Sequence, residues 1–570
     1  MQRRWRLRPC PDGADERLRH ALGVSPIVAR VLATRGIDSP EAAEAFLQPR
    51  LSTSLRSPML FRQMPAAAAR IVAALSNGEK IGIYGDYAVD GMSGSAVLVR
   101  FLRSLGHDPA LFIPQRMRDG YGLGEPGIQR LAAAGTKLMI TVDCGGVSHR
   151  EISFAASLGI DTIVCDHHQV SGTPLPALAV LNPIEPDCGF PFQGLCGAGV
   201  AFYLAMGTRM HLREAGRRDL PDLRRLLDLV TLGTIADVVP LVEENRALVS
   251  AGLREILQSG MPGMVALKQV AGVTSVSSST VGFRLAPRLN AAGRLSDATR
   301  GVELLTTEEH DRATQLAREL DEENQARRDI EAEMLDDALH RIERDSRASE
   351  RKVIVLASDD WHPGVVGIVA ARLVDRFYRP AVVIAVDPTT GLGRGSGRSI
   401  PGLDLHAALG QVRNELEAFG GHPMAAGLTV RSARIDSLRD ELDRAIAACT
   451  RPEDFVAQTW VDAEVVLQEI DGPLVDELAR VGPHGAGNPE PVLLVRGATV
   501  AGARIVGERH LKLYLRQDRG ALAGIAFGAA DAGIKQSSSI DALVTPERNE
   551  WQGRSTIEFR LRDWRPAKAL

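Results

Sequence analysis

The chain has 570 residues, of which 45% are hydrophobic and 24% are charged, and its formal net charge is -4. This composition argues against large-scale disorder, and no stretch approaches the roughly 20 apolar residues that span a bilayer. The length exceeds what one core supports, so we expect three or four domains. The basic N-terminus is followed by no apolar run, which predicts no signal peptide. The six cysteines form no CxxC pair and favour reduced thiols in a cytoplasmic protein.

Residues 1–70 predict an N-terminal helical extension that ends near a helix of small residues at 65–75. From about 80 to 245, short apolar runs alternate with helical stretches such as 94–105 and 197–213. This alternation predicts a doubly wound α/β domain with a parallel sheet, which we place within residues 71–305.

Residues 306–350 predict one long helix, because charged residues dominate, apolar residues recur at a spacing of about four, and glycine and proline are absent between 307 and 350. A helix of about 40 residues would be about 60 Å long. A coiled coil is the alternative interpretation. The apolar seam is interrupted at 323–328, and this favours a helix that bridges two domains.

Residues 351–452 predict a second α/β domain, with strands at 353–357 and 381–386 and a helix at 365–377. Glycine-rich segments follow at 391–399 and 420–423. The remaining residues, 453–570, contain short β-like segments such as 492–495, 511–515 and 556–561. They predict a small β-barrel, so the expected fold is α/β with a C-terminal barrel.

Acidic residues and histidines follow three of the predicted strands. The runs that end at 85, 142 and 165 lead into Asp86, into Asp143 and into the triplet Asp166-His167-His168. In a parallel sheet, ligands bind outside the carboxyl ends of the strands, and crowded carboxylates repel one another unless cations lie between them. A single aspartate after a strand is more simply a helix cap or turn residue. Three strand ends with a histidine pair instead predict a metal centre with the ligands Asp86, Asp90, Asp143, His167 and Asp237.

The predicted ligands suit Mn²⁺ or Mg²⁺ better than zinc, because they are carboxylates and an imidazole rather than thiolates. Two such ions can activate water and stabilise the leaving oxygen in a phosphoryl displacement. Adjacent histidines point in different directions, so His167 can bind metal while His168 faces the substrate phosphate. Asp166 either orients an imidazole or caps the following segment.

Two further segments suggest phosphate and base contacts. The glycine-rich run with Ser396, Arg398 and Ser399 suits an anion nest of backbone N–H groups, with a flexible turn as the simpler alternative. Arg398 can grip a phosphate bidentately. Arg116 and Tyr121 follow the first acidic strand, and Tyr121 is either a stacking platform for a base or an ordinary half-buried side chain.

Together these motifs resemble the DHH phosphoesterase superfamily and, within it, the RecJ family of bacterial single-strand-specific exonucleases. The resemblance covers nearly the whole chain and rests on the segments 85–91, 141–143, 166–168, 233–240 and 287–294. Segments 361–368 and 420–423 resemble the DHHA1 domain of that family, and 483–491 resembles the start of its OB-fold domain.

The resemblance implies a 5′→3′ exonuclease on single-stranded DNA that needs two Mn²⁺ or Mg²⁺ ions, releases 5′-mononucleotides and acts in DNA recombination and repair. It implies a DHH domain and a DHHA1 domain that face each other across a cleft too narrow for duplex DNA. It further implies a monomer whose partners are single-strand-binding protein and a RecQ-type helicase.

The resemblance also implies roles for individual residues. Asp166 and His168 match the catalytic signature. The residues implied to contact DNA are Arg116, Ser396 and Arg398 at the 5′ phosphate, Tyr121 beneath a base, Arg288 and Arg294 at the backbone, and His422 in the 420–423 motif.

The chain departs from the family at Ala88. The first motif of the family is Asp-x-Asp-x-Asp-Gly, and here alanine occupies the middle position. A methyl group cannot bind a cation, so we expect metal affinity and kcat to fall substantially while single-strand binding survives. Ala88 is either an introduced substitution or natural variation, and the intact neighbouring carboxylates favour the first.

Two rival functions remain open. One is a DHH phosphodiesterase of short oligonucleotides or of pyrophosphate, against which the long helix and the C-terminal β region argue. The other is a non-catalytic single-stranded-DNA-binding protein, which Ala88 makes plausible.

Overall fold

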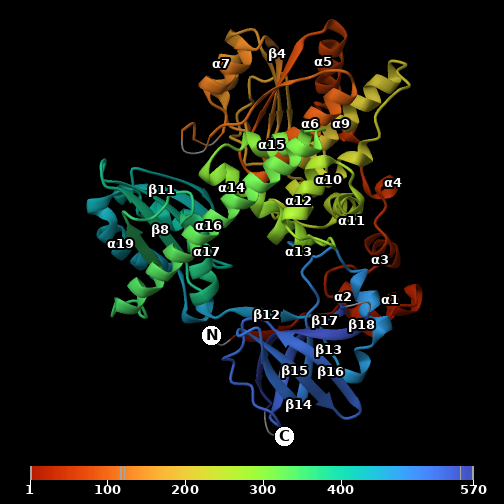
Figure 1. The fold of residues 1–570 in the computed structure, drawn as a ribbon, viewed down its shortest axis with the longest axis vertical. Helices are drawn as coiled ribbons and strands as arrows, with labels where there is room; N and C mark the ends of the chain where they lie inside the picture. Colours follow the sequence, from red (N-terminus) through yellow and green to blue (C-terminus); the bar gives the residue numbers. More distant parts are fainter. Residues whose placement is uncertain (1–2, 116–117, 121, 552–553, 568–570) are drawn as a thin grey trace. The chain divides into compact units, whose positions relative to one another are not determined.

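The computed structural model describes residues 3–115, 118–120, 122–551 and 554–567 (Figure 1). The chain divides into two compact units. One unit is built mainly from Trp5–Leu289, Ala298–Ala317 and Trp460–Leu570, and the other mainly from Asn290–Asp297 and Arg318–Thr459. None of the described helices is long and apolar enough to cross a membrane.

The first unit contains the predicted parallel sheet. Its five strands lie in the order β3-β2-β4-β5-β6, all parallel, with the bounds Ala110–Phe112, Lys80–Gly85, Thr136–Val142, Asp161–Cys165 and Ala179–Leu181. The chain runs outward to β3 and then returns to the other side of β2, so the strand order switches between β2 and β4. Such a switch point is where open α/β sheets bind their ligands.

Helices cover both faces of this sheet. One group consists of α5 (Met64–Asn77), α6 (Val89–Ser104) and α9 (Gly197–Glu214), in which α9 contacts both other helices and all three contact the strands. The other group consists of α7 (Glu125–Ala133) and α8 (His149–Ser157), which contact each other and the strands. Helix α6 begins five residues before the predicted 94. Its start is fixed by a close approach, since a Cβ on Gly91 would lie 2.5 Å from the carbonyl oxygen of Asp86.

A helical region follows the sheet in the chain. Its main helices are α10 (Leu227–Ala236), α11 (Glu243–Gln258), α12 (Pro262–Val270), α14 (Ala286–Leu295) and α15 (Thr299–Thr306). A short π-helix, Val281–Leu285, leads into α14.

The predicted long helix is α16, which spans His310–Arg344 and is about 50 Å long at 1.5 Å per residue (Figure 1). The boundary between the two compact units falls within it, after Ala317, which agrees with a helix that bridges domains. The interruption of its apolar seam is explained by buried polar contacts, because Arg327 donates to Glu331 at 2.8 Å and to Asn324 at 3.1 Å.

The second unit contains a mixed sheet in the order β10-β11-β9-β8-β7, with the bounds Ala418–His422, Ala425–Arg431, Leu392–Arg398, Ala381–Asp387 and Ile354–Ser358. The helices of this unit include α17 (Val366–Phe377), α18 (Leu405–Gln411) and α19 (Ile435–Cys449).

Both interpretations of the 391–399 run, an anion nest and a flexible turn, are wrong. Most of the run is β9, which pairs with β8 on one side and β11 on the other, so its backbone groups belong to the sheet ladder. The glycines reflect tight packing, because a Cβ on Gly395 would meet Ile384 and Leu428, and one on Gly397 would meet Leu405.

The C-terminal residues form the predicted barrel. The strands are β14 (Leu493–Val506), β15 (His510–Gln517), β16 (Gly520–Ala526), β17 (Ser539–Trp551) and β18 (Arg554–Pro566), and pairing of β14 with β17 closes the sheet. A short strand, β13 (Ala463–Glu464), adds to β14.

The N-terminal helices share a core with this barrel. Helices α1 (Ala14–Leu22), α2 (Pro26–Ala33) and α3 (Pro40–Leu47) contribute apolar side chains to the same cluster as the barrel strands and α20 (Gly472–Ala479). The N-terminal extension is therefore part of the C-terminal structure, a connection that the sequence pattern does not reveal.

Candidate active site

The predicted ligands gather at the carboxyl edge of the parallel sheet. Asp86 follows β2, Asp143 follows β4, and Asp166-His167-His168 follows β5. Asp90 comes from the first turn of α6. Asp237 is the residue that ends α10. Elements far apart in the sequence thus deliver acidic and imidazole groups to one place.

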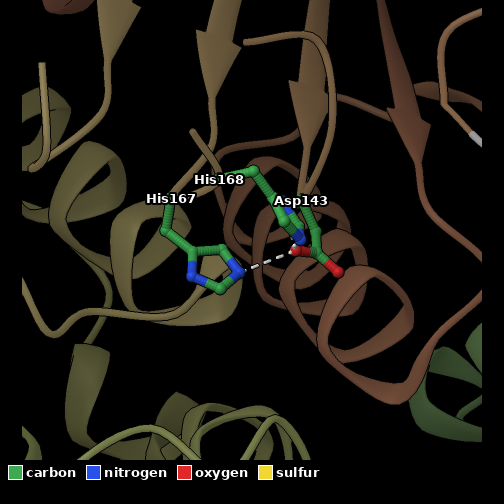
Figure 2. A group of neighbouring side chains, drawn as sticks. All are labelled: Asp143, His167 and His168. Atoms are coloured by element: carbon green, nitrogen blue, oxygen red, sulfur yellow. Dashed lines mark hydrogen bonds and ion pairs between the residues drawn. The ribbon is translucent and has the colours of Figure 1, made fainter. Parts of the chain in front are cut away.

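His167 lies at the centre of this group. Its Nε2 is 3.0 Å from Asp143 Oδ1 (Figure 2), and 3.6 Å from both Asp90 Oδ2 and Asp237 Oδ2. Two sets of potential ligand atoms result, Asp143 with His167 and His168, and Asp90 with His167 and Asp237. The two sets adjoin at His167 and suit two neighbouring cations, of which His167 Nε2 can bind only one because it has a single lone pair.

Asp90 is fixed by the N-terminus of α9, the helix predicted at 197–213, although the contact itself was not predicted from the sequence. Its two carboxylate oxygens accept hydrogen bonds from the backbone N–H groups of Gly197 at 2.5 Å and Ala198 at 2.9 Å, in the first turn of α9. The positive end of the helix dipole stabilises this carboxylate. A Cβ on Gly197 would lie 2.7 Å from Asp143 Cβ, and a glycine that opens a predicted helix is the one signal for this contact.

Asp166 orients His168. His168 Nδ1 lies 2.8 Å from Asp166 Oδ1, and Asp166 also accepts from the backbone N–H of His167 at 2.8 Å and of Gly146 at 2.7 Å. Burial opposes ionisation of Asp166, but these hydrogen bonds and the His168 charge lower its pKa overall. Burial likewise opposes charging of His168, but Asp166 and Asp143 outweigh it and raise the pKa of His168 to about 9.

Asn182 supports the same loop, and its role was not predicted from the sequence. It follows β6, is fully buried, and donates from Nδ2 to the backbone oxygen of His168 at 2.9 Å. Its own Oδ1 accepts from the N–H of Ile184. The His167-His168 turn is therefore held from two sides.

Burial and neighbouring carboxylates raise the pKa of two of the predicted ligands, Asp143 and Asp237. Burial, followed by the charges of Asp90 and Asp86, raises the pKa of Asp143 well above its ordinary value. Burial and the charge of Asp90 raise the pKa of Asp237 to about 7. Divalent cations would relieve this repulsion, and carboxylate oxygens with imidazole are ligands suited to Mn²⁺ or Mg²⁺. The residues present therefore fit a two-cation centre.

Ala88 caps α6 without a side-chain hydrogen bond. Its backbone N–H donates to Asp86 Oδ2 at 3.0 Å, so the two residues are held side by side. The methyl group supplies neither a cation ligand nor a helix cap at this position.

A second group of predicted residues meets at the start of α17. The Arg398 guanidinium donates to Ser396 Oγ and to the Gly397 backbone oxygen, both at 2.8 Å. A Cβ on Gly367, in the first turn of α17, would lie 2.9 Å from Arg398 Nη2 and from Ser396 Oγ. Arg294 donates to the Gly364 backbone oxygen at 3.1 Å, just before the same helix. A helix N-terminus with an arginine and a hydroxyl is suited to an anion.

The other predicted contact residues lie elsewhere. Arg288 belongs to the first unit and donates to the backbone oxygens of Arg284 and Val270. His422 is exposed at the end of β10. Arg116 and Tyr121 lie outside the described residues.

Comparison with known proteins matches three segments of the chain. Residues 80–234 match the DHH family N-terminal domain, 350–448 the DHHA1 domain and 461–563 the RecJ OB domain. The chain is similar to the single-stranded-DNA-specific exonuclease RecJ of Dickeya dadantii, with 38% identity over 557 residues that cover 94% of this chain and 95% of the relative. The chain belongs to the RecJ family.

Other RecJ proteins are similar over comparable lengths. The RecJ of Bacillus subtilis is 37% identical over 567 residues, which cover 98% of this chain and 70% of the relative. The crystal structure of RecJ from Thermus thermophilus in complex with Mn²⁺ has 32% sequence identity and a TM-score of 0.84, and covers 100% of this chain and 80% of that one. The structure of the same protein with Mg²⁺ gives a TM-score of 0.79 with 31% identity, over 99% of this chain and 79% of that one.

Proposed function

We propose that this chain is a metal-dependent exonuclease that degrades single-stranded DNA from the 5′ end and releases 5′-mononucleotides. The observation that carries the proposal is the convergence of Asp90, Asp143 and Asp237 around His167 Nε2 at the carboxyl edge of the parallel sheet, with His168 beside them. The RecJ relatives, which are named single-stranded-DNA-specific exonucleases, support it. A role in DNA recombination and repair in the cytoplasm is part of the same proposal.

Asp86, Asp90, Asp143, His167 and Asp237 would hold two ions, Mn²⁺ or Mg²⁺, the metals present in the RecJ structures of Thermus thermophilus. Such ions supply an activated water molecule and neutralise charge in the transition state of phosphodiester hydrolysis. The residues of the chain do the positioning, because the N-terminus of α9 fixes Asp90 and the β5 loop fixes His167.

His168 has a different role from His167 in this proposal. Its Nδ1 is engaged by Asp166, and in the metal-free protein Asp166 and Asp143 outweigh burial and raise its pKa to about 9, which favours the protonated ring. A protonated imidazole can stabilise negative charge on the scissile phosphate or protonate the leaving oxygen. Asp166 acts through His168 and orients the ring.

The site at the start of α17 would bind the 5′ phosphate of the strand. This site combines the Arg398 guanidinium, the Ser396 hydroxyl and the first N–H groups of α17. Arg398 can bind a phosphate through two N–H donors. A phosphate anchor sets which bond is cut and so gives the direction of degradation. By resemblance, Arg116, Tyr121, Arg288, Arg294 and His422 contact the rest of the strand.

Ala88 weakens this activity in our proposal, because one cation loses an oxygen ligand. The same observation favours a second candidate function, a protein that binds single-stranded DNA without cutting it. A phosphodiesterase of short oligonucleotides is disfavoured by the C-terminal barrel, which matches the RecJ OB domain over 461–563.

The domain organisation belongs to the proposal as well. The limits 71–305 for the DHH domain and 453–570 for the OB-fold each enclose the matched family segment, and 351–452 for DHHA1 begins one residue inside it. Partnership with single-strand-binding protein and a RecQ-type helicase, and a monomeric state, are proposed from the resemblance alone.

The test is degradation of a long single strand with a 5′ phosphate in Mn²⁺, beside the same strand with a 5′ hydroxyl, a blunt duplex and a trinucleotide. We expect slow release of mononucleotides from the phosphorylated strand and none from the duplex. Asp237→Asn serves as the control that abolishes the residual rate. Tight strand binding with no turnover, here and in an Ala88→Asp variant, would establish the binding protein instead.

A further inference from the structure

The first turn of α11 contains three consecutive polar residues that are buried. Glu244 and Asn245 are 0% exposed and Arg246 is 2% exposed. Burying a polar group without a hydrogen bond destabilises the fold, so we expect each of these side chains to have hydrogen-bond partners. Glu244 accepts two hydrogen bonds from Arg56 at 2.6 and 2.8 Å, and Arg246 donates to backbone oxygens at 46 and at 480–482.

Asn245 links the segment before α9, which supports Asp90, to the segment that carries Asp237. Its Nδ2 donates to the backbone oxygen of Gly194 at 2.6 Å and to that of Pro240 at 3.0 Å. Gly194 lies just before the start of α9, whose N–H groups hold Asp90. Pro240 follows Asp237 by three residues. One side-chain amide therefore ties the support of one ligand to the backbone of another.

The segment after Asp237 needs such a tie, because its backbone is strained. Val238 has a φ of 61° and is 69% exposed, and Glu243 has a φ of 43°. A β-branched side chain rarely adopts the left-handed region, and it persists there only when the surroundings hold it. Exposed Val238 has little packing of its own, so hydrogen bonds from neighbouring elements must define the turn. Asn245 supplies one of them, and the N–H of Leu241 supplies another by donating to Ala486 O at 2.8 Å.

We propose that Asn245 is a positioning residue that sets the separation of Asp90 and Asp237 and thereby the affinity of the site for divalent cations. This inference rests on the proposed function, in which both aspartates bind metal. Groups behind the ligands typically change metal affinity by roughly 10- to 100-fold when they are removed. Asn245 acts through the backbone, so we expect an effect of about tenfold, at the low end of that range.

The test is Asn245→Ala in the full chain, with Mn²⁺ binding followed by electron paramagnetic resonance of the free ion. We expect the Mn²⁺ dissociation constant to rise about tenfold. In the Ala88→Asp background, the Mn²⁺ concentration for half-maximal cleavage should rise by the same factor, while KM for single-stranded DNA stays constant. A residue that serves only stability would lower the melting temperature and leave the Mn²⁺ titration unchanged.

Lys268→Met is the matched control. Lys268 donates from Nζ to the backbone oxygens of Ile256 at 2.7 Å and Leu257 at 2.9 Å, at the opposite end of α11. The variant loses two hydrogen bonds from a side chain to backbone oxygens of α11, far along that helix from the ligand segments. We expect a lower melting temperature and an unchanged Mn²⁺ dissociation constant.

Asp237→Asn separates the inference from the proposed function. If Asp237→Asn weakens Mn²⁺ binding and Asn245→Ala changes it less than twofold, the inference is overturned and the proposed function stands. If neither variant changes Mn²⁺ binding, the ligand assignment itself fails. Should Asn245→Ala not fold, Asn245→Leu, which is similar in size and has no hydrogen-bond donor, replaces it, and a change below twofold overturns the inference in the same way.

Discussion

Restoring an acidic residue at position 88 tests the central assignment of the active site. Ala88 caps α6 with no side-chain hydrogen bond, and its N–H lies 3.0 Å from Asp86 Oδ2. An Ala88→Asp variant would place a third carboxylate beside Asp86 and Asp90. The variant should therefore be less stable than the starting chain without divalent metal and more active than it with metal bound.

The magnitudes follow from two opposing effects. Aspartate is a better N-cap than alanine by about 1 kcal/mol. A carboxylate about 5 Å from Asp86 is repelled by about 3 kcal/mol at an effective dielectric constant near 20. Metal-free protein should thus lose about 2 kcal/mol, which lowers its melting temperature by roughly 4–8 °C. With metal bound, the added ligand contributes several kcal/mol to transition-state stabilisation, and about 4 kcal/mol corresponds to roughly a thousandfold in rate.

The assay measures mononucleotide release from 5′-phosphorylated single-stranded DNA in Mn²⁺, and melting temperatures with EDTA and with Mn²⁺. Ala88→Asn is the matched control, because asparagine caps a helix about as well as aspartate but adds no charge. We expect Ala88→Asn to be more stable than the starting chain without metal and to gain little activity.

An Ala88→Asp variant that raises the rate less than tenfold and melts like Ala88→Asn in EDTA would refute this assignment of position 88. That result would mean that the side chain at position 88 does not face the cluster around His167. Survival of strand binding in all three proteins, with none of them cutting, would favour the binding-protein function.

Four further outcomes are expected. In EDTA the melting temperature should fall from pH 5 to pH 8, because the pKa of Asp237 in the folded protein is raised to about 7. The stabilising protonation of Asp237 is complete at low pH and is lost as the pH rises through that value. Mn²⁺ should therefore raise the melting temperature more at pH 8 than at pH 5. Asp166→Asn should lower the pKa of His168 from about 9 towards its ordinary value, as followed by NMR titration of the imidazole, and an unchanged titration would contradict the pairing. Gly197→Ala should weaken Mn²⁺ binding at least roughly tenfold, since its Cβ would lie 2.7 Å from Asp143 Cβ; equal affinities in a calorimetric titration would show that the helix can shift at no cost. Arg398→Lys should reduce the preference for a 5′-phosphorylated over a 5′-hydroxyl strand by roughly tenfold, because lysine cannot form the paired hydrogen bonds of a guanidinium; an unchanged ratio of the two rates would place the phosphate elsewhere.

The sequence predicts the parts of this site that depend on strand ends. Asp143 and His167 follow buried apolar runs closely, and in a parallel sheet this alone determines which edge they share. The long helix is equally predictable, because its composition excludes other structures over 35 residues.

Contacts between distant segments are what the sequence does not predict. The glycines before Arg398 resemble a loop when read alone, and their place inside a sheet is decided by side chains of β8 and β11. The contacts of Asp90 with Ala198 and of Asn245 with Gly194 join residues that are 108 and 51 positions apart, and no periodicity encodes such pairs.

The common core of the N-terminal helices and the C-terminal barrel has a consequence for synthesis of the chain. Apolar residues of α1 and α2, among them Leu18, Val28 and Leu32, reach their partners only when the barrel strands have left the ribosome. At roughly 5–20 residues per second, the roughly 400 intervening residues take about 20–80 s to make. Throughout that interval these helices present an uncovered apolar surface, so they can become native only after the barrel strands, which are made long after them.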